Sequence, residues 1–280
     1  FLGATPEGIV TTLGRGGSDY SAALLGAFLP AGEVWIWTDV DGVMTADPRL
    51  VPEAVTIHQL SYREVSELAY FGAKVLHPKT IRPVIENNIP LRVCNTFAPE
   101  KQGTWVVSDT TRVTEGVVKA VTAISGLSLI TVEGRGMLGV PGVAARTFEA
   151  VAKTGTSVPL ISQASSEQSI CFTVPFEAAE RVKSSLEHAF AGEIQRRDID
   201  GITSSAVMGI VSVVGAGMRY IPGVAGRVFT ALGDAKVNVV AIAQGSSEVS
   251  ISLVVAENEL KRAMQTLHVL ILPEQELNHE

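Results

Sequence analysis

The sequence is poor in the residues that mark several large classes of protein. It contains two cysteines, Cys94 and Cys171, too few for a disulfide framework and without the CxxC spacing of a zinc site. The 22 lysines and arginines fall short of the 29 aspartates and glutamates, and the net charge is −7. Such a balance argues against a partner that is nucleic acid or an anionic membrane. No apolar run reaches the ~18–20 residues that a membrane-spanning helix needs.

Apolar side chains, in contrast, are abundant. They make up 46% of the 280 residues, so the chain can bury a sizeable core as one large or two ordinary domains. The low cysteine content is typical of a reducing compartment, and the cytoplasm is the simplest expectation. The chain begins at Phe1, inside a segment that looks ordered and has no signal peptide. We interpret it as a piece of a longer polypeptide.

An internal repeat divides the chain. Residues 132–174 align without gaps onto residues 213–255, and PGVA at 141–144 returns at 222–225. Each copy shows the pattern of strand, glycine-rich turn, helix, strand, strand and helix, with a fourth strand possible. That order predicts a ferredoxin-like α+β unit, present twice.

Expected elements follow from periodicity and from β-branched runs. In the repeat, we expect helices at 143–153, 177–190, 224–232 and 257–267 and strands at 127–132, 158–162, 169–174, 206–214, 237–243 and 250–255. Before it, we expect helices at 20–28, 61–71 and 79–87 and strands at 9–13, 34–37 and 89–93. Alternation of helices and apolar strands in this first part indicates an α/β layer structure.

The first motif is the glycine-rich turn of residues 14–20, GRGGSDY, which precedes an apolar helix. Glycines let a backbone approach a ligand, and a helix N-terminus offers free N–H groups to a carboxylate or phosphate. Arg15 could hold a carboxylate with two hydrogen bonds. The alternative is an ordinary tight turn in which Ser18 or Asp19 caps the helix.

Two further motifs lie in the first part. Residues 37–43, WTDVDGV, place polar groups just after a strand, where open α/β sheets bind ligands. Turn formation by Asp-Gly and Asp-Pro is the alternative. In residues 71–78, FGAKVLHP, Lys74 could bind a phosphate or could be a solvated charge, and His77 is more often a capping or packed residue. No histidine has metal-ligand spacing, so we expect no protein-bound metal.

These three motifs, followed by the repeat, resemble those of the aspartokinases. LGRGGSDYSAALL, WTDVDGVMTADPR and ELAYFGAKVLHPKTI carry the resemblance in the first part. ISQASSEQSICF and IAQGSSEVSISL in the repeat look most like the threonine-sensitive type, which includes forms fused to homoserine dehydrogenase. The resemblance implies an α/β fold, part of an amino-acid-kinase domain, over residues 1–110. Two α+β ferredoxin-like ACT domains would follow at 118–200 and 201–272, with the last strand returning to complete the first.

The resemblance also implies a reaction. The γ-phosphate of MgATP would pass to the side chain of L-aspartate and give 4-phospho-L-aspartate, the first step toward lysine, threonine, methionine and isoleucine. The aspartate-binding residues would be Arg15, Gly16, Gly17 and Ser18, and Asp19 would orient a catalytic lysine. The nucleotide site would be lined by Thr38, Asp39, Met44, Arg49, Lys74 and Val75. The family's lysine-bearing segment KFGGTS is absent from the sequence, so we expect no turnover by these 280 residues alone.

The same resemblance gives the repeat an amino-acid-sensing role. A buried Gln163 and Gln244 would line the effector pockets, together with four residues of the glycine-rich turns: Met137, Gly142, Met218 and Gly223. The alternative is that these residues form turns and pack the repeat interface. Pro159 stands where lysine-sensitive relatives tend to carry an acidic residue, so we expect threonine as the effector. ACT sheets usually pair between protomers, so we expect a homodimer or a larger oligomer, with inhibition relayed through residues 106–119.

Two other interpretations stay open. The chain could be a non-catalytic amino-acid sensor in which the kinase-like part is only a scaffold. It could also be a different amino-acid kinase that acts on glutamate or a nucleotide. The presence of Arg15, Asp19, Asp39 and Lys74 together favours the aspartokinase over a scaffold, and the pairing of the GRGGSDY turn with two ACT units speaks against another kinase.

Overall fold

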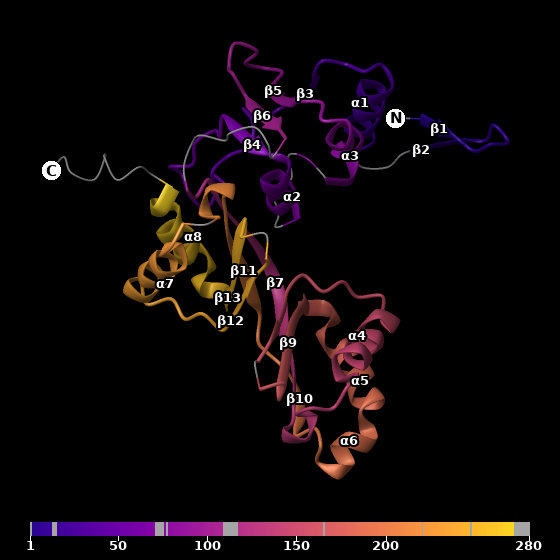
Figure 1. Ribbon diagram of the computed structural model, residues 1–280, viewed down its shortest axis with the longest axis vertical. Coiled ribbons are helices and arrows are strands. Elements are labelled where there is room, and N and C mark those ends of the chain that lie inside the picture. The colour runs from indigo at the N-terminus through magenta and orange to yellow at the C-terminus, as the bar shows by residue number, and fades with distance from the viewer. Residues whose placement is uncertain are drawn as a thin grey trace.

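The computed structural model describes residues 2–12, 16–70, 76, 78–108, 117–164, 166–219, 221–246 and 248–271. Three parts follow one another: an N-terminal segment (residues 2–108), a first unit and a second unit. Figure 1 shows the N-terminal segment at the top, the second unit beside and below it, and the first unit farthest away.

The N-terminal segment is built around a four-stranded sheet in the order β3-β5-β6-β4. Its strands are β3 (Val34–Thr38), β4 (Gln59–Ser61), β5 (Leu91–Asn95) and β6 (Thr104–Val107). The helices are α1 (Gly17–Phe28), α2 (Tyr62–Tyr70) and α3 (Pro78–Glu86). A separate exposed hairpin consists of β1 (Leu2–Ala4) and β2 (Val10–Thr12). β3 runs parallel to β5, so the ends of these two strands lie together.

The first unit contains the C-terminal half of the long strand β7 (Ala120–Glu133). Its other strands are β8 (Ile161–Gln163), β9 (Ser169–Pro175) and β10 (Gly201–Ser204). Its helices are α4 (Val143–Lys153), α5 (Ala179–Ala189) and α6 (Ala191–Arg196), with the short 3-10 helices η1 (Arg135–Met137) and η2 (Phe176–Ala178). The sheet order β10-β7-β9-β8 is that of a ferredoxin-like unit.

The second unit has the same arrangement. Its strands are β11 (Met208–Val214), β12 (Ala241–Gln244) and β13 (Ser250–Ala256). Its helices are α7 (Val224–Asp234) and α8 (Leu260–His268), with the short 3-10 helices η3 (Ala216–Met218), η4 (Glu257–Glu259) and η5 (Val269–Ile271). The N-terminal half of β7 pairs with β11 and supplies the fourth strand. One strand therefore serves both units.

Among the described residues, no strand after α8 pairs with the first unit, so the expected return of a last strand stays a prediction. β10 pairs with residues 130–133 of β7. β10 thus belongs to the first unit, although it follows the expected boundary at residue 200. The second unit is completed from upstream, by residues 120–127, instead.

The apolar clusters show how the three parts are joined. The first unit's core, which includes Phe172 and Leu186, contains residues of that unit alone. The second unit's core includes Ala46 and Val51 of the N-terminal segment. The core of the N-terminal segment in turn includes three residues of the second unit: Ala120, Val214 and Val249. The second unit and the N-terminal segment therefore contribute residues to each other's cores.

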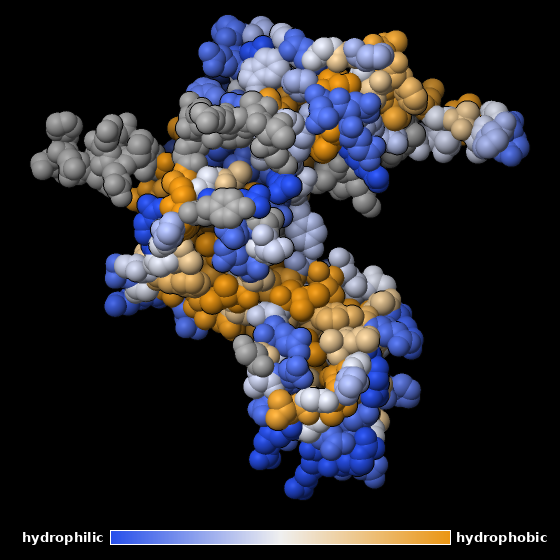
Figure 2. All heavy atoms as spheres, viewed as in Figure 1, coloured by the Kyte–Doolittle hydropathy of each residue, from blue (hydrophilic) through white to orange (hydrophobic). Residues whose placement is uncertain are grey.

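A further apolar cluster joins strands of the two units, with Leu127 and Leu129 facing Ile210 and Val254. Figure 2 shows apolar residues gathered in a band across the middle of the molecule, over the strands shown there in Figure 1. Helices α4, α5, α7 and α8 pack on the other faces of these strands, as the two unit cores show. The strands of the two units form one seven-stranded sheet, and the helices of each unit cover part of it.

Candidate functional site

The N-terminus of α1 has the geometry of an open backbone site. Gly16 is the N-cap residue and adopts the left-handed conformation (φ 72°), and no side chain caps the helix. Ser18 donates its hydroxyl hydrogen to Asp19 Oδ1 over 3.1 Å. The alternative in which Ser18 or Asp19 caps the helix is therefore not what the structure shows. The first-turn N–H groups stay available for an anion, while Arg15 lies outside the described residues.

The carboxyl end of β3 carries the second predicted motif. Thr38 ends the strand and donates to Asp39 Oδ1 over 3.2 Å, and Asp39 is exposed. Asp41 has a structural role instead, because it accepts a hydrogen bond from Asn95 Nδ2 and pairs with Lys101, each over 2.6 Å. The hydrogen bond from Lys101, and after it that from Asn95, lowers the pKa of Asp41. The side chains of Thr38 and Asp39 thus bond to each other at this strand end, whereas that of Asp41 is bonded to residues farther along the chain.

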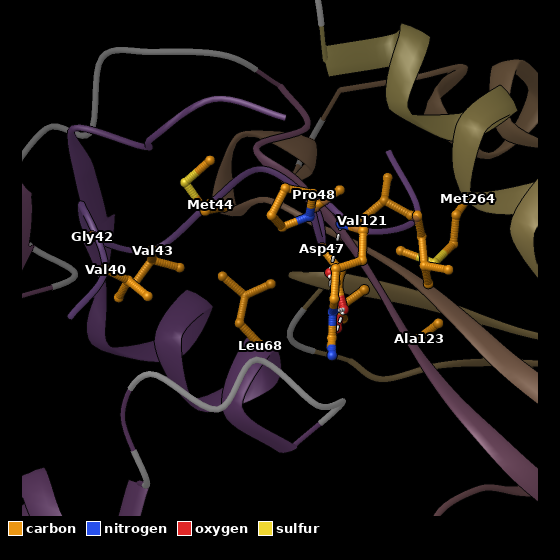
Figure 3. A pocket seen from close by; sticks show the side chains of 14 residues that line it. Val40, Gly42, Val43, Met44, Asp47, Pro48, Leu68, Val121, Ala123 and Met264 are labelled. Atoms are coloured by element: carbon orange, nitrogen blue, oxygen red, sulfur yellow. Dashed lines mark hydrogen bonds and ion pairs between the residues drawn. The ribbon is translucent and has the colours of Figure 1, made fainter. Parts of the chain in front are cut away.

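A cavity of about 310 Å3 lies next to this edge. Met44 and Arg49 line it, whereas Thr38 and Asp39 do not. Figure 3 shows Leu68 of α2 between the loop residues Val43 and Met44 on one side and residues of the second unit on the other. The contributing residues there are Val121, Thr122, Ala123 and Met264. Two of the expected nucleotide-site residues therefore lie in a pocket between the N-terminal segment and the second unit.

Arg49 is held in place by Asp47. The guanidinium lies 2.6 Å from Asp47 Oδ2, and its side chain is 84% exposed. The hydrogen bond between them lowers the pKa of Asp47 and raises that of Arg49. Met44 forms a β-bridge with Thr56, whose hydroxyl lies 3.5 Å from the sulfur. Lys74, Val75 and His77, which complete the third motif, lie outside the described residues.

The contact between this loop and the second unit was not foreseen from the sequence. The Val121 N–H donates to the Thr45 carbonyl over 2.8 Å, and the Thr45 hydroxyl lies 2.9 Å from His268 Nε2 in α8. Gln265, also in α8, donates to the Leu50 carbonyl over 3.0 Å. Burial lowers the pKa of His268, against a smaller opposing effect of Glu53. The loop that bears Met44 and Arg49 is therefore fixed to α8.

The expected effector residues fall into two groups. Met137 and Met218 are buried, 3% and 4% exposed, in the cores of their units. This burial agrees with the alternative in which these residues serve packing, and a place in the effector pockets stays a prediction. Gln163 and Gln244 end the edge strands β8 and β12, and both are exposed rather than buried in the single chain. Gly142 and Gly223 adopt left-handed conformations (φ 90° and 87°) at the N-caps of α4 and α7.

Two features are not found in the part of the chain that the structure describes: a cluster of metal ligands and a helix able to span a membrane. No group of three or more histidine, cysteine, aspartate or glutamate side chains is arranged to hold a metal ion among these residues. None of the helices described is both long and apolar enough to cross a membrane.

Comparisons with known proteins identify the parts. Residues 1–95 match the amino acid kinase family, and residues 130–190 and 211–269 match the ACT domain. The molecule is therefore an amino acid kinase segment joined to two ACT domains, as the predicted fold class has it.

Whole-chain comparisons are more specific. The sequence is 47% identical over 268 residues to the bifunctional aspartokinase/homoserine dehydrogenase of Haemophilus influenzae, which covers 96% of this chain and 33% of that protein. Clostridium acetobutylicum aspartate kinase has a TM-score of 0.88 and 29% identity over 97% of this chain and 62% of its own. E. coli aspartokinase III, solved with aspartate and ADP, has a TM-score of 0.77 and 31% identity over 97% and 59%. The chain is thus similar to aspartokinases over nearly its whole length, and it spans a third of the bifunctional relative.

Proposed function

We propose that this chain carries part of the catalytic site of an aspartate kinase together with its amino-acid-sensing region. The reaction is transfer of the γ-phosphate of MgATP to the side chain of L-aspartate. The observation that carries the proposal is the uncapped N-terminus of α1, together with Thr38 and Asp39 at the end of β3, in a chain whose relatives are aspartokinases. E. coli aspartokinase III, which has the same fold, was solved with aspartate and ADP.

Phosphoryl transfer depends on positioning and charge neutralisation more than on covalent chemistry. In this proposal Arg15 and the backbone of residues 16–18 hold the carboxylates of aspartate, and Asp19 positions the lysine that faces the transferred phosphate. The nucleotide lies along Thr38 and Asp39, with Met44 and Arg49 at the cavity. Lys74 and Val75 complete that site. In this proposal Mg2+ arrives with the nucleotide.

The regulatory part of the proposal concerns the two ACT domains. We expect L-threonine to bind beside Gln163 and Gln244, which end exposed edge strands. Edge strands are free to pair with another chain, so a homodimer through these edges would cover both amides. Val158, Pro159 and Leu160 offer no charge to the ammonium of a lysine side chain, which favours a small hydroxyl amino acid. The proposed compartment is the cytoplasm.

The competing proposal is a non-catalytic amino-acid sensor. The fixing of the Met44–Arg49 loop to α8 favours the kinase, because a sensor alone has no use for contacts between an effector-binding unit and a nucleotide loop. Calorimetric titration separates the two. A kinase segment should bind MgADP and L-aspartate, and a sensor should bind an amino-acid effector alone.

The titration needs variants to locate the sites. Arg49→Ala should weaken MgADP binding about tenfold, as expected for the loss of one charge-assisted contact to phosphate. Arg82→Ala is the matched control, because Arg82 is also exposed and also pairs with a carboxylate over 2.6 Å. Gln163→Ala and Gln244→Ala should weaken threonine binding and leave MgADP binding unchanged. Lysine binding without threonine binding would overturn the effector assignment, and turnover by these 280 residues alone would overturn the predicted need for the KFGGTS segment.

A further inference from the structure

A buried carboxylate connects the N-terminal segment to the second unit. Glu64 lies in the first turn of α2 and has no solvent exposure. Its Oε2 accepts the Ser61 N–H over 2.7 Å, and the Glu64 N–H in turn lies 3.3 Å from Ser61 Oγ. This reciprocal pair is a capping box, which normally needs only one carboxylate oxygen and normally sits at the surface.

The other carboxylate oxygen reaches a different domain. Glu64 Oε1 accepts the N–H of Ala216 over 2.7 Å, across 152 positions of sequence. Lys119, which is 4% exposed, places its ammonium 3.4 Å from Oε2 and donates to the Gln59 carbonyl over 2.8 Å. A buried charge is stable only when paired and hydrogen-bonded, so this carboxylate is held in one position.

The first unit shows what the same turn does without such a partner. Ala216 and Arg135 occupy equivalent places in the repeat, at the start of η3 and η1. Gly215 and Gly134 before them donate to equivalent carbonyls, those of Val249 and Gln168. The acceptor for the next N–H differs. Arg135 donates to the carboxylate of Asp200 in its own unit, over 3.3 Å and partly exposed to solvent.

We propose that Glu64 is a positioning residue that transmits changes in the turn of the second unit to α2, and that, among the described residues, the equivalent turn of the first unit has no such link. The turn contains Met218, and α2 contains Leu68, which lines the cavity with Met44 and Arg49. A shift of the turn therefore displaces the cavity wall through one hydrogen bond and one capping box. A role of this link in regulating phosphoryl transfer rests on the proposed kinase function. The physical connection between the turn and α2 does not depend on that function.

Hydrogen exchange on the 280-residue chain tests the link without any ligand. Met218→Ala opens a cavity beneath the turn of the second unit, and Met137→Ala does the same in the first unit, where the methionine is equally buried. We expect Met218→Ala to speed exchange of the α2 amides about tenfold, within the usual range of coupling between sites. Met137→Ala should leave them within about twofold, because the first unit has its own acceptor.

A second background isolates the carboxylate. Glu64→Gln with Lys119→Met removes both charges together, so no buried charge is left unpaired, but the amide cannot accept from both Ser61 and Ala216. In this background Met218→Ala should still speed exchange in the turn and should add less than about twofold in α2. If the tenfold effect persists there, packing or the contact of Glu67 with Ser250 carries the coupling and the proposal fails.

Equal effects of Met218→Ala and Met137→Ala on α2 would also overturn the proposal. The outcome is independent of the kinase assignment. Calorimetry with threonine and MgADP on the same samples tests that assignment. If calorimetry shows no binding of threonine or MgADP, the proposed function loses support. The hydrogen-exchange result still tests the connection between the turn and α2.

Discussion

The two units share sequence, fold and sheet order, yet they relate differently to the N-terminal segment. The second unit shares two apolar clusters with that segment, and Glu64, Thr45 and Leu50 bond to it. The core of the first unit contains residues of that unit alone, and among the described residues an exposed hydrogen bond joins it to the segment, from the Tyr70 hydroxyl to the Pro159 carbonyl over 3.5 Å. The repeat has therefore given two similar folds, of which one is packed into the N-terminal segment and the other extends from it.

The largest expected difference between the two units is in the stability lost when the acceptor of each turn is removed. Glu64→Ala removes the carboxylate that faces the buried Lys119 ammonium and takes the acceptor from Ala216. We expect a loss of about 3–5 kcal/mol in the free energy of unfolding, measured by urea denaturation. Asp200→Ala removes the corresponding acceptor of the first unit at a partly exposed site and should cost less than about 1 kcal/mol. Similar losses in the two variants would show that the two turns are held alike.

Truncation of a core leucine should cost the two units similar stability, but only in the second unit should its effect extend to the N-terminal segment. Leu232 in α7 and Leu186 in α5 are both fully buried, so each change to alanine should cost about 2–5 kcal/mol. The core around Leu232 includes Ala46 and Val51, so Leu232→Ala should speed exchange of the Val121 N–H that is bonded to Thr45. Leu186→Ala should leave that amide unchanged. Faster exchange at Val121 in both variants would mean that the first unit is not independent.

The glycine caps should behave alike and so provide a baseline. Gly142 and Gly223 have φ near 90°, and an added Cβ would meet no atom within 4 Å at either place. Alanine there suffers only from the left-handed backbone, at about 1–2 kcal/mol for each substitution. Thermal or urea unfolding of the two variants should agree within experimental error. A larger loss at Gly223 would show that contact with the N-terminal segment stiffens that turn too.

The smallest expected effect is a dependence on pH. Burial holds the pKa of His268 below its ordinary value of 6.5, so the unfolded chain takes up the proton first. The contribution to stability is therefore complete above pH 6.5 and is lost as the pH falls toward the folded-state pKa. His268→Gln should flatten the slope of unfolding free energy against pH in that window. His188→Gln at the exposed end of α5 should leave it unchanged, and a slope unaffected by His268→Gln would contradict the assignment.

Local patterns predicted the helices and strands that are long enough to show a clear hydrophobic period. Residues 143–153 were expected to be helical and are α4. The short elements β4, β6 and α6 have three to six residues each and were missed, since so few positions show no period. The doubled use of β7 was also missed. Residues 120–126 carry no signal that distinguishes an extra strand from a linker.

The places of several candidate-site residues in the fold were predictable from the sequence, and their tertiary surroundings were not. Gly16, Thr38 and Asp39 lie at a helix start and a strand end, as their motifs indicated. The Ser61–Glu64 capping box is readable in the sequence, but its second partner, Ala216, is not, because no local rule relates positions so far apart. The same holds for His268 and Thr45. Tertiary contacts of this kind are visible only once the sheets are assembled.

The sharing of β7 between two units also sets an order of events during synthesis. Leu127 is paired with Met208, which the ribosome adds 81 residues later. At about 5–20 residues per second, the N-terminal half of β7 waits roughly 4–16 seconds for the strand that will cover it. Through that interval it presents open backbone groups and apolar side chains to other nascent chains. A slowly translated stretch just before residue 208 would lengthen the interval, and aggregation of the newborn chain would rise with it.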